Sequence, residues 1–380
     1  MSDPKFAKLS PTGQAERLIH FKQMGDPLAD DAVADLLLMP KEERDAFLNR
    51  ALEQGLPGIK NGPESWHRLL EQVEHVPSWV DWKAFNHGSR AFLRAGGLGM
   101  FVLGCQVTPL FYRLSNGNKA LSFSGRLTQR ASRRGRETAR FVIETCLPYN
   151  LQRHGDGFKI TLRVRLMHAQ VRKMIAASGR WDYGQYGVPI SQVYMASMIC
   201  LLSAQWIEGL RHLGMHLTKP EEEGLMQLWR YSAYLIGVNE ELLFTTKQEA
   251  LQFFEMVLAA EPPPDDDARE LIHAIINTIP DVMGYTGRAN RRMHGFCEGL
   301  AVSLLGAELS SQLKLKRTFW RHSPKLLRGA IPIWSMLERI FPPFRRHSQL
   351  HGTRLWLDAA EFPPQGGLEM FAAARQATED

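Results

Sequence analysis

Apolar residues recur at helical spacing along almost the whole chain, and the strict alternation that marks a half-buried strand is scarce. A long, almost wholly apolar segment, Ile190 to Leu213, follows a proline and has the length of a helix rather than of a strand. With 380 residues, 44% of them hydrophobic, the chain is long enough to bury a large core. We therefore predict an all-α protein built around one large helical domain.

Proline and glycine divide the first part of the chain into short amphipathic segments. Helical spacing over residues 15–24, 31–39 and 42–54 is interrupted at Gly25-Asp26-Pro27, at Pro40 and at residues 55–58. We expect residues 1–80 to form an N-terminal helical cap that packs on the body of the protein, residues 81–362. The glycine- and alanine-rich residues 363–380 are expected to form a flexible tail.

The cysteines and the start of the chain bear on where the protein works. Four cysteines are scattered without a Cys-x-x-Cys pair, which predicts buried free thiols and a reducing cytoplasm. Residues 1–14 are polar and do not resemble a signal sequence. The apolar run from Ala95 to Leu110 is shorter than a membrane span, so we expect no transmembrane segment and leave only peripheral membrane contact open. A net charge of +6 is modest for this length and does not imply a nucleic-acid partner.

Residues 163–172 form the stretch most suggestive of a site. On a helix, Arg165, His168 and Arg172 fall within about 60° of one another, beside an apolar face. A histidine in this position is usually a satisfied core residue, and the two arginines could be solvated. The same arrangement would also suit a haem, with the imidazole on the iron and the arginines on the propionates.

Three motifs, in order along the chain, resemble one known family. Residues 165–172 resemble the Arg-x-x-His-Ala-x-Val-Arg signature of the family of latex clearing proteins and mycophenolic-acid oxygenases. Residues 187–192 resemble its Gly-x-Pro-Ile-x-Gln turn. Residues 229–243 resemble its Trp-Arg…Leu-Gly-x-x-Glu-x-Leu-Leu segment. The resemblance extends from about residue 125 to just beyond residue 258.

The resemblance implies a partly globin-like fold around haem b, with His168 as the proximal iron ligand. It implies an oxygenase that uses O2 to cleave or oxygenate a carbon–carbon double bond of a lipophilic, isoprenoid-like substrate. The arginine-rich helix expected over residues 125–147 would be the distal wall, with Arg134, Glu137 and Thr138 in catalytic positions. Latex-clearing relatives carry Arg-x-x-Lys-Thr there, so Glu137 replaces a lysine that can occupy the sixth iron position. This difference puts polymer cleavage in doubt and predicts an open or water-bound sixth position.

Other functions remain open at this stage. Within a haem protein, the alternatives are a peroxidase or an oxygen sensor. Asp266-Asp267 resembles the acidic Mg²⁺ motif of all-α isoprenoid synthases, although acids are expected in the first turn of any helix. The arginines between Arg126 and Arg140 could instead bind nucleic acid or an anionic membrane. His212 and His216 have the i, i+4 spacing of zinc ligands but no companion acid between them, which favours a surface pair.

The segment from Ala95 to Leu114 carries four glycines among large apolar residues. Glycine weakens a helix by about 1 kcal/mol relative to alanine, so a close neighbour must justify it. Tight helix packing and the wall of an apolar substrate cavity explain the pattern equally well. In the second case, this segment and the helix after Pro189 would line a cavity for a long lipophilic chain.

Overall fold

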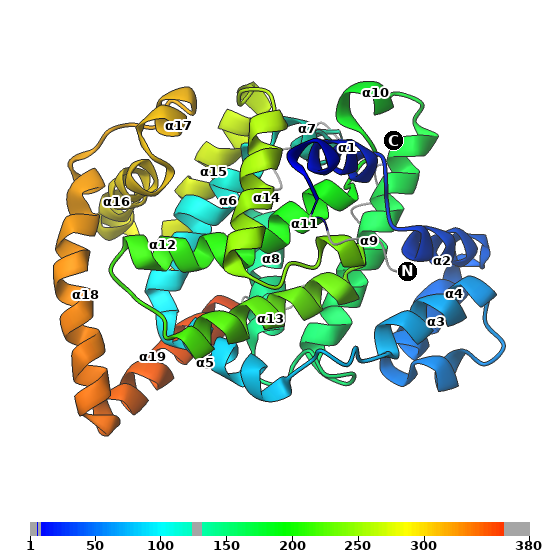
Figure 1. The fold of residues 1–380 in the computed structure, drawn as a ribbon, viewed down its shortest axis with the longest axis horizontal. Helices are drawn as coiled ribbons and strands as arrows, with labels where there is room; N and C mark the ends of the chain where they lie inside the picture. The colour runs from blue at the N-terminus through cyan, green and yellow to red at the C-terminus, as the bar shows by residue number, and fades with distance from the viewer. Residues whose placement is uncertain (1–5, 7–8, 124–130, 361–380) are drawn as a thin grey trace.

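The computed structural model describes residue 6, residues 9–123 and residues 131–360, and no strand occurs among them. The all-α prediction is therefore confirmed for this part of the chain, which Figure 1 shows as one assembly of packed helices. The predicted tail, residues 363–380, lies outside the described residues. The principal helices are α1 (Pro11–Lys22), α2 (Pro27–Leu38), α3 (Lys41–Gln54), α4 (Glu64–Glu74), α5 (Trp82–Val102), α6 (Thr108–Tyr112), α7 (Ser115–Ser122), α8 (Ala131–Cys146), α9 (Asp156–Ala177), α10 (Tyr183–Tyr186), α11 (Gln192–Cys200), α12 (Trp206–His212), α13 (Lys219–Leu235), α14 (Lys247–Ala260), α15 (Asp266–Val282), α16 (Gly287–Leu305), α17 (Ala307–Gln312), α18 (Ser323–Ile340) and α19 (Pro342–Ala360).

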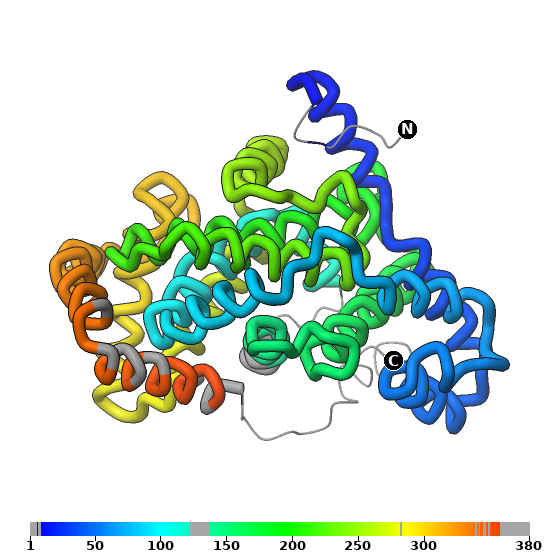
Figure 2. Tube along the Cα trace, turned by 60° about the horizontal axis from the view of Figure 1, so that its bottom comes forward, coloured from blue at the N-terminus to red at the C-terminus, as the bar shows by residue number. Residues whose placement is uncertain are grey.

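The N-terminal helices begin earlier than helical spacing alone predicts. Helix α2 starts at Pro27 because Asp26 caps it, its side chain accepting a hydrogen bond from the backbone of Ala29 at 3.4 Å. The prediction treated Gly25-Asp26-Pro27 as an interruption, whereas it is a helix start. Helices α2, α3 and α4 gather at one end of the molecule, where α2 packs along α9 (Figures 1 and 2).

The centre of the fold is formed by α5, α11–α12 and α13. Helices α5 and α13 approach most closely at Gly88 and Gly224, where a Cβ on Gly88 would lie 2.5 Å from the backbone nitrogen of Leu225. Trp206 and Trp229 are completely enclosed nearby. The predicted apolar helix at 190–213 is present over Gln192–His212 and contains one π-helical segment, Leu201–Gln205. The two glycines therefore set the spacing between α5 and α13.

The glycines between Ala95 and Leu114 serve helix packing. Gly96 breaks α5 with φ +46°, and a Cβ there would lie 3.0 Å from the Cα of Gly352 in α19. Gly99 faces Trp206 and Trp356, and Gly104 faces Ile279, at distances that leave no room for a methyl group. The expectation that this segment walls an apolar cavity is therefore wrong for these positions, because neighbouring helices already fill the space.

Within residues 9–123 and 131–360, two segments are long and apolar enough to cross a membrane by composition. They are Trp82–Tyr112 and Gln192–His212, and 56% and 83% of their apolar windows are buried inside the fold. Core helices of soluble proteins meet the same criterion. The first segment is longer than the apolar run seen in the sequence, because α5 continues through the π-helical residues Leu103–Val107 into α6.

Candidate functional site

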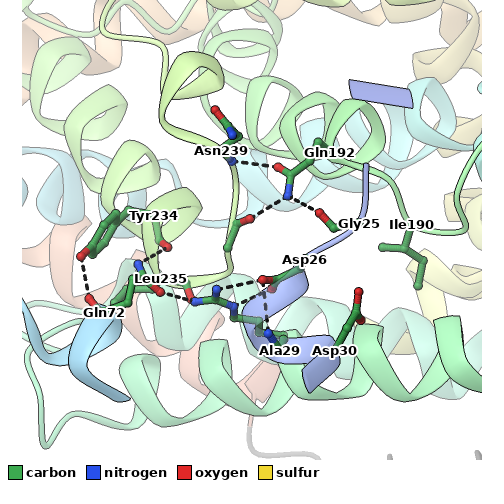
Figure 3. A network of polar contacts seen from close by, with 12 residues as sticks. Gly25, Asp26, Ala29, Asp30, Gln72, Ile190, Gln192, Tyr234, Leu235 and Asn239 are labelled. Atoms are coloured by element: carbon green, nitrogen blue, oxygen red, sulfur yellow. Dashed lines mark hydrogen bonds and ion pairs between the residues drawn. The ribbon is translucent and has the colours of Figure 1, made fainter. Parts of the chain in front are cut away.

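Helix α9 places His168, Arg165 and Arg172 on one side, as the sequence predicted, but the two arginines already have acidic partners. The guanidinium of Arg165 is buried and forms a two-pronged ion pair with Asp26. Its Nε lies 2.6 Å from Oδ2 of Asp26, and its Nη2 lies 3.0 Å from Oδ1. Its Nη1 donates to Oε1 of Gln72 and to the carbonyl of Leu235 at 3.1 Å. Figure 3 shows Asp26, Gln72 and Leu235 gathered around this centre.

These contacts change the role expected for Arg165. Four of the five hydrogens of the guanidinium point at protein acceptors, so little is left for a haem propionate. These contacts give Arg165 a structural role, and its direct part in cofactor binding stays a prediction. The residue ties α9 to the start of α2 and to the end of α13. Such a buried pair is costly to break, because it leaves one charge uncompensated.

Gln192 connects the same centre to two loops. Its Nε2 donates to the carbonyls of Gly25 at 2.7 Å and Gly237 at 2.9 Å, and its Oε1 accepts from the backbone of Asn239 at 2.8 Å (Figure 3). Both donor hydrogens and one acceptor position of the buried amide are used in this way. The three motifs singled out in the sequence therefore meet at one place, and they hold α9 in position.

Gly237 lies directly against the Asp26–Arg165 ion pair, in a conformation that only glycine adopts without strain. Its φ of +88° lies in the left-handed region, and a Cβ there would lie 2.3 Å from Oδ2 of Asp26 and 2.6 Å from Nε of Arg165. We expect Gly237→Ala to lower the free energy of unfolding by about 2–4 kcal/mol, through backbone strain and disruption of the ion pair. Urea denaturation measures this loss. Gly284→Ala is the matched control, since Gly284 also has a positive φ but no atom near its missing Cβ. An equal loss in both variants would mean that the ion pair contributes nothing.

Arg172 is engaged less completely. Its Nε lies 2.7 Å from Oδ1 of Asp30 in α2, and its Nη1 lies 3.4 Å from the carbonyl of Ile190. Its Nη2 is buried and has no hydrogen-bond partner among the described residues. Burial raises the pKa of Asp30, against the lowering effect of Arg172. Arg172 thus retains one enclosed donor that could meet an additional anionic group.

His168 lies between the two arginines along the helix. The residue is half-buried, but its Nδ1 is enclosed and has no hydrogen-bond partner within the described residues. Desolvation, reinforced by Arg172 and opposed by Asp26, lowers the pKa of His168 to about 3. The imidazole is therefore neutral at physiological pH, which is the form that binds a metal. An unpartnered ring nitrogen in an enclosed position calls for a ligand or a proton acceptor beyond those that the described residues supply.

The residues expected on the distal side lie on α8, which packs against α9. Glu137 is half-buried and Thr138 is exposed. The side chain of Arg134 lies outside the described residues, as do residues 124–130, so the basic helix expected from residue 125 is described as a helix only from Ala131. The structure brings α8 beside the helix of His168.

The other sequence candidates have ordinary partners. Asp265 caps α15 and, with Asp267, binds Lys119 at 2.7 and 2.9 Å. Asp266 binds Arg269. These contacts explain the acids as helix-capping and surface ion pairs rather than as a Mg²⁺ motif.

His212 lies 3.2 Å from Oγ of Ser303 and also contacts Arg328, and burial lowers its pKa. It lines a polar cavity of about 610 Å³ between α12 and α18, together with His216, Gln106, Gln205 and Arg211.

Sequence reasoning missed the acidic and amide partners of α9. Asp26 and Asp30 lie about 140 residues before the arginines they bind, and Gln72 belongs to α4. Gln192 was quoted within a motif but given no role. One signal was available in the sequence. Asp26 and Asp30 lie close together in the region predicted to form an amphipathic cap, and a helix that only packs its apolar face on a core does not need these two carboxylates. The four cysteines, by contrast, are all free and buried, as predicted.

Comparison with known proteins agrees with this arrangement. Residues 82–333 match the family described as "ER-bound oxygenase mpaB/B'/Rubber oxygenase, catalytic domain". A rubber oxygenase of Streptomyces sp. (strain K30) is 22% identical over 227 residues, which is 56% of this chain and 52% of the relative. The chain thus matches about half the length of that curated relative. A solved structure, of latex clearing protein in the closed state, superposes with a TM-score of 0.58 at 17% identity, over 94% of this chain and 90% of the other, which shows a shared fold. Because the match spans most of the helical body, the chain belongs to the family of the mpaB and rubber oxygenase catalytic domains.

Proposed function

We propose that this protein is a haem b-dependent oxygenase that uses O2 to cleave or oxygenate a carbon–carbon double bond of a lipophilic, isoprenoid-like substrate. The observation that carries the proposal is His168: a neutral imidazole with an enclosed, unpartnered nitrogen on the face of α9 that the family motif marks. Family membership supports the oxygenase class. The solvent-shielded thiols suit a reducing cytoplasm, which we propose as the compartment.

Two residues on this side of α9, His168 and Arg172, suit a haem as the sequence predicted, whereas Arg165 has a structural role that was not first expected. His168 would ligate the iron, and the Nη2 of Arg172 would meet a propionate, since both atoms are enclosed and lack partners among the described residues. Arg165 would act indirectly, by holding α9 against α2 and α13. The haem, when bound, would supply the site at which O2 is activated. The protein's own part is to keep the imidazole neutral, oriented and shielded from water.

Neutrality of His168 gives the haem-free protein a defined pH dependence. Its folded-state pKa of about 3 lies below the unfolded value of about 6.5. The unfolded chain therefore takes up the proton first, and stability falls as the pH decreases from about 6.5 towards 3. The wild-type free energy of unfolding should therefore decrease by about 1–2 kcal/mol between about pH 7 and pH 5 because of His168, and this part of the decrease should be absent in His168→Gln. Urea denaturation at the two pH values measures it. The exposed His216→Gln variant is the control. Identical pH profiles for all three proteins would show that His168 is not held neutral.

Glu137 offers a test of the distal side. Because it replaces the lysine of latex-clearing relatives, we expect the ferric protein to lack the spectrum of two axial nitrogen ligands and to accept cyanide or imidazole readily. If Glu137 also moves protons, Glu137→Gln should lower turnover by about 10²–10⁴-fold with the haem spectrum retained. A low-spin resting spectrum would exclude the open position, and unchanged turnover in Glu137→Gln would exclude the base.

One preparation separates this proposal from its alternatives. A pyridine haemochrome spectrum of the purified protein tests haem b, and product analysis with a prenyl-chain series under O2 tests oxygenase activity. Affinity should rise with chain length, since each buried methylene contributes roughly 0.8 kcal/mol. Turnover that needs peroxide instead of O2 would indicate a peroxidase. Reversible O2 binding without product would indicate a sensor. Absence of haem binding would remove the proposal.

A further inference from the structure

The outward side of α18 carries an apolar stripe that no described residue covers. Leu326, Ile333, Met336 and Ile340 are 75%, 59%, 51% and 58% exposed. Their spacing of seven, three and four residues places them on one side of the helix. The inward side is occupied by Glu338, which is buried against Arg94. Helix α18 lies at the outer edge of the molecule (Figure 1), so the stripe faces away from the protein.

Aromatic residues extend the stripe at both ends of the helix. Phe319 and Trp320 precede α18 and are 81% and 42% exposed, while Phe341 follows it and is 55% exposed. Isolated exposed apolar residues are normal on a soluble protein. Several large exposed apolar residues along one side of a helix, with exposed aromatic residues at its ends, usually mark an interaction site.

The same segment concentrates the positive charge of the chain. Residues 314–354 contain ten Lys and Arg and one Glu, a net charge of +9. The remaining residues contain 36 Lys and Arg and 39 Asp and Glu, a net charge of −3. The net positive charge of the protein therefore resides here. Seven of these cations form no ion pair within the described part of the chain: Lys314, Lys316, Arg317, Arg321, Lys325, Arg328 and Arg354.

The apolar stripe and the positive charge together indicate which kind of partner could cover this side of α18. A second copy of the chain would bring its own nine positive charges against these. Nucleic acid would satisfy the cations but would leave the aliphatic stripe in water. An anionic lipid surface satisfies both, because an interfacial helix buries its apolar side among acyl chains while Lys and Arg meet the headgroups. We propose that α18, with Phe319, Trp320 and Phe341, docks the protein on anionic lipid bilayers. The helix would lie in the plane of the bilayer surface. The protein would then encounter a lipophilic substrate in the bilayer, where such a substrate dissolves.

Vesicle co-sedimentation of the full-length protein tests the proposal without reference to haem or turnover, so its failure is distinct from failure of the proposed oxygenase function. We expect binding to vesicles of phosphatidylcholine with phosphatidylglycerol, little binding to phosphatidylcholine alone, and release at high salt. The Leu326→Ser/Ile333→Ser/Ile340→Ser variant should bind on the order of a hundredfold more weakly. Its control is Ile19→Ser/Leu38→Ser, which removes equally exposed apolar side chains elsewhere and should bind like the wild type.

A second variant pair tests the charges. Arg317→Gln/Arg321→Gln/Lys325→Gln should weaken binding by about fivefold per cation, whereas Lys60→Gln/Lys83→Gln/Arg90→Gln, all exposed, should not. Circular dichroism of each variant verifies that it is folded. Failure of the wild type to sediment, or equal loss with the control variants, overturns the proposal. It is also overturned if the stripe variant abolishes dimerisation while leaving lipid binding intact, or if the protein binds DNA through the cations independently of the stripe.

Discussion

The His168→Ala variant should be purified without a Soret band, whereas the proposed haem ligation predicts one for the wild type. The alanine offers no ligand for iron, and its neighbours on the helix, Arg165 and Arg172, are cations that cannot replace an imidazole. Because the removed ring is partly enclosed and unpartnered at Nδ1, its loss should not unfold the protein. The measurements are the absorbance spectrum after haem reconstitution and the thermal unfolding of the haem-free form.

Two control experiments show whether the loss of the Soret band is specific to the His168 side chain. Free imidazole added to His168→Ala should restore a Soret band, because the truncated side chain leaves space at the ligand position. His212→Ala, which truncates another half-buried histidine, should bind haem normally. A His168→Ala protein with full haem occupancy and an unchanged spectrum would remove His168 from the site, and with it the main support for the proposed function.

Asp26→Ala is expected to cost about 3–5 kcal/mol of stability, the largest loss among the substitutions considered. The side chains of Asp26 and Arg165 are 4% and 2% exposed, so the variant leaves a buried guanidinium without its counter-ion. It also removes the cap of α2. Urea denaturation of the haem-free protein measures the loss. Asp30→Ala should cost much less, because Asp30 is 31% exposed and water can replace it.

A double-mutant cycle identifies the cause of the loss. In Asp26→Asn the cap survives but the charge does not, so most of the destabilisation should remain. Asp26→Asn combined with Arg165→Met should recover part of it, since no unpaired charge is then buried. Additive losses in the double variant would show that the two residues act independently and that the ion pair is not what holds α9.

The sequence was sufficient for the helices and for the side of α9 that carries His168, because both follow from periodicity within one segment. It was not sufficient for the function of Arg165. Whether an arginine at the edge of an apolar face meets solvent, a propionate or a carboxylate depends on which distant residue packs there, and Asp26 is 139 positions away. The glycines at 96, 99 and 104 illustrate the same limit. Their pattern allowed a cavity or close packing, and only the positions of Gly352, Trp206 and Ile279 decided for packing.

The junction at Gln192 has a consequence for the synthesis of the chain. Helix α9 is complete in sequence at residue 177, but the acceptors that seat it include the carbonyls of Leu235 and Gly237, and the amide of Asn239 closes the last hydrogen bond of Gln192. While a nascent chain is still shorter than this, Arg165 has Asp26 and Gln72 but lacks the carbonyl of Leu235. Long-range closure of this kind comes late in folding. We therefore expect the surroundings of His168 to be completed only after some sixty residues beyond α9 have left the ribosome. A cofactor bound there would be inserted after that point and not during synthesis of the helix itself.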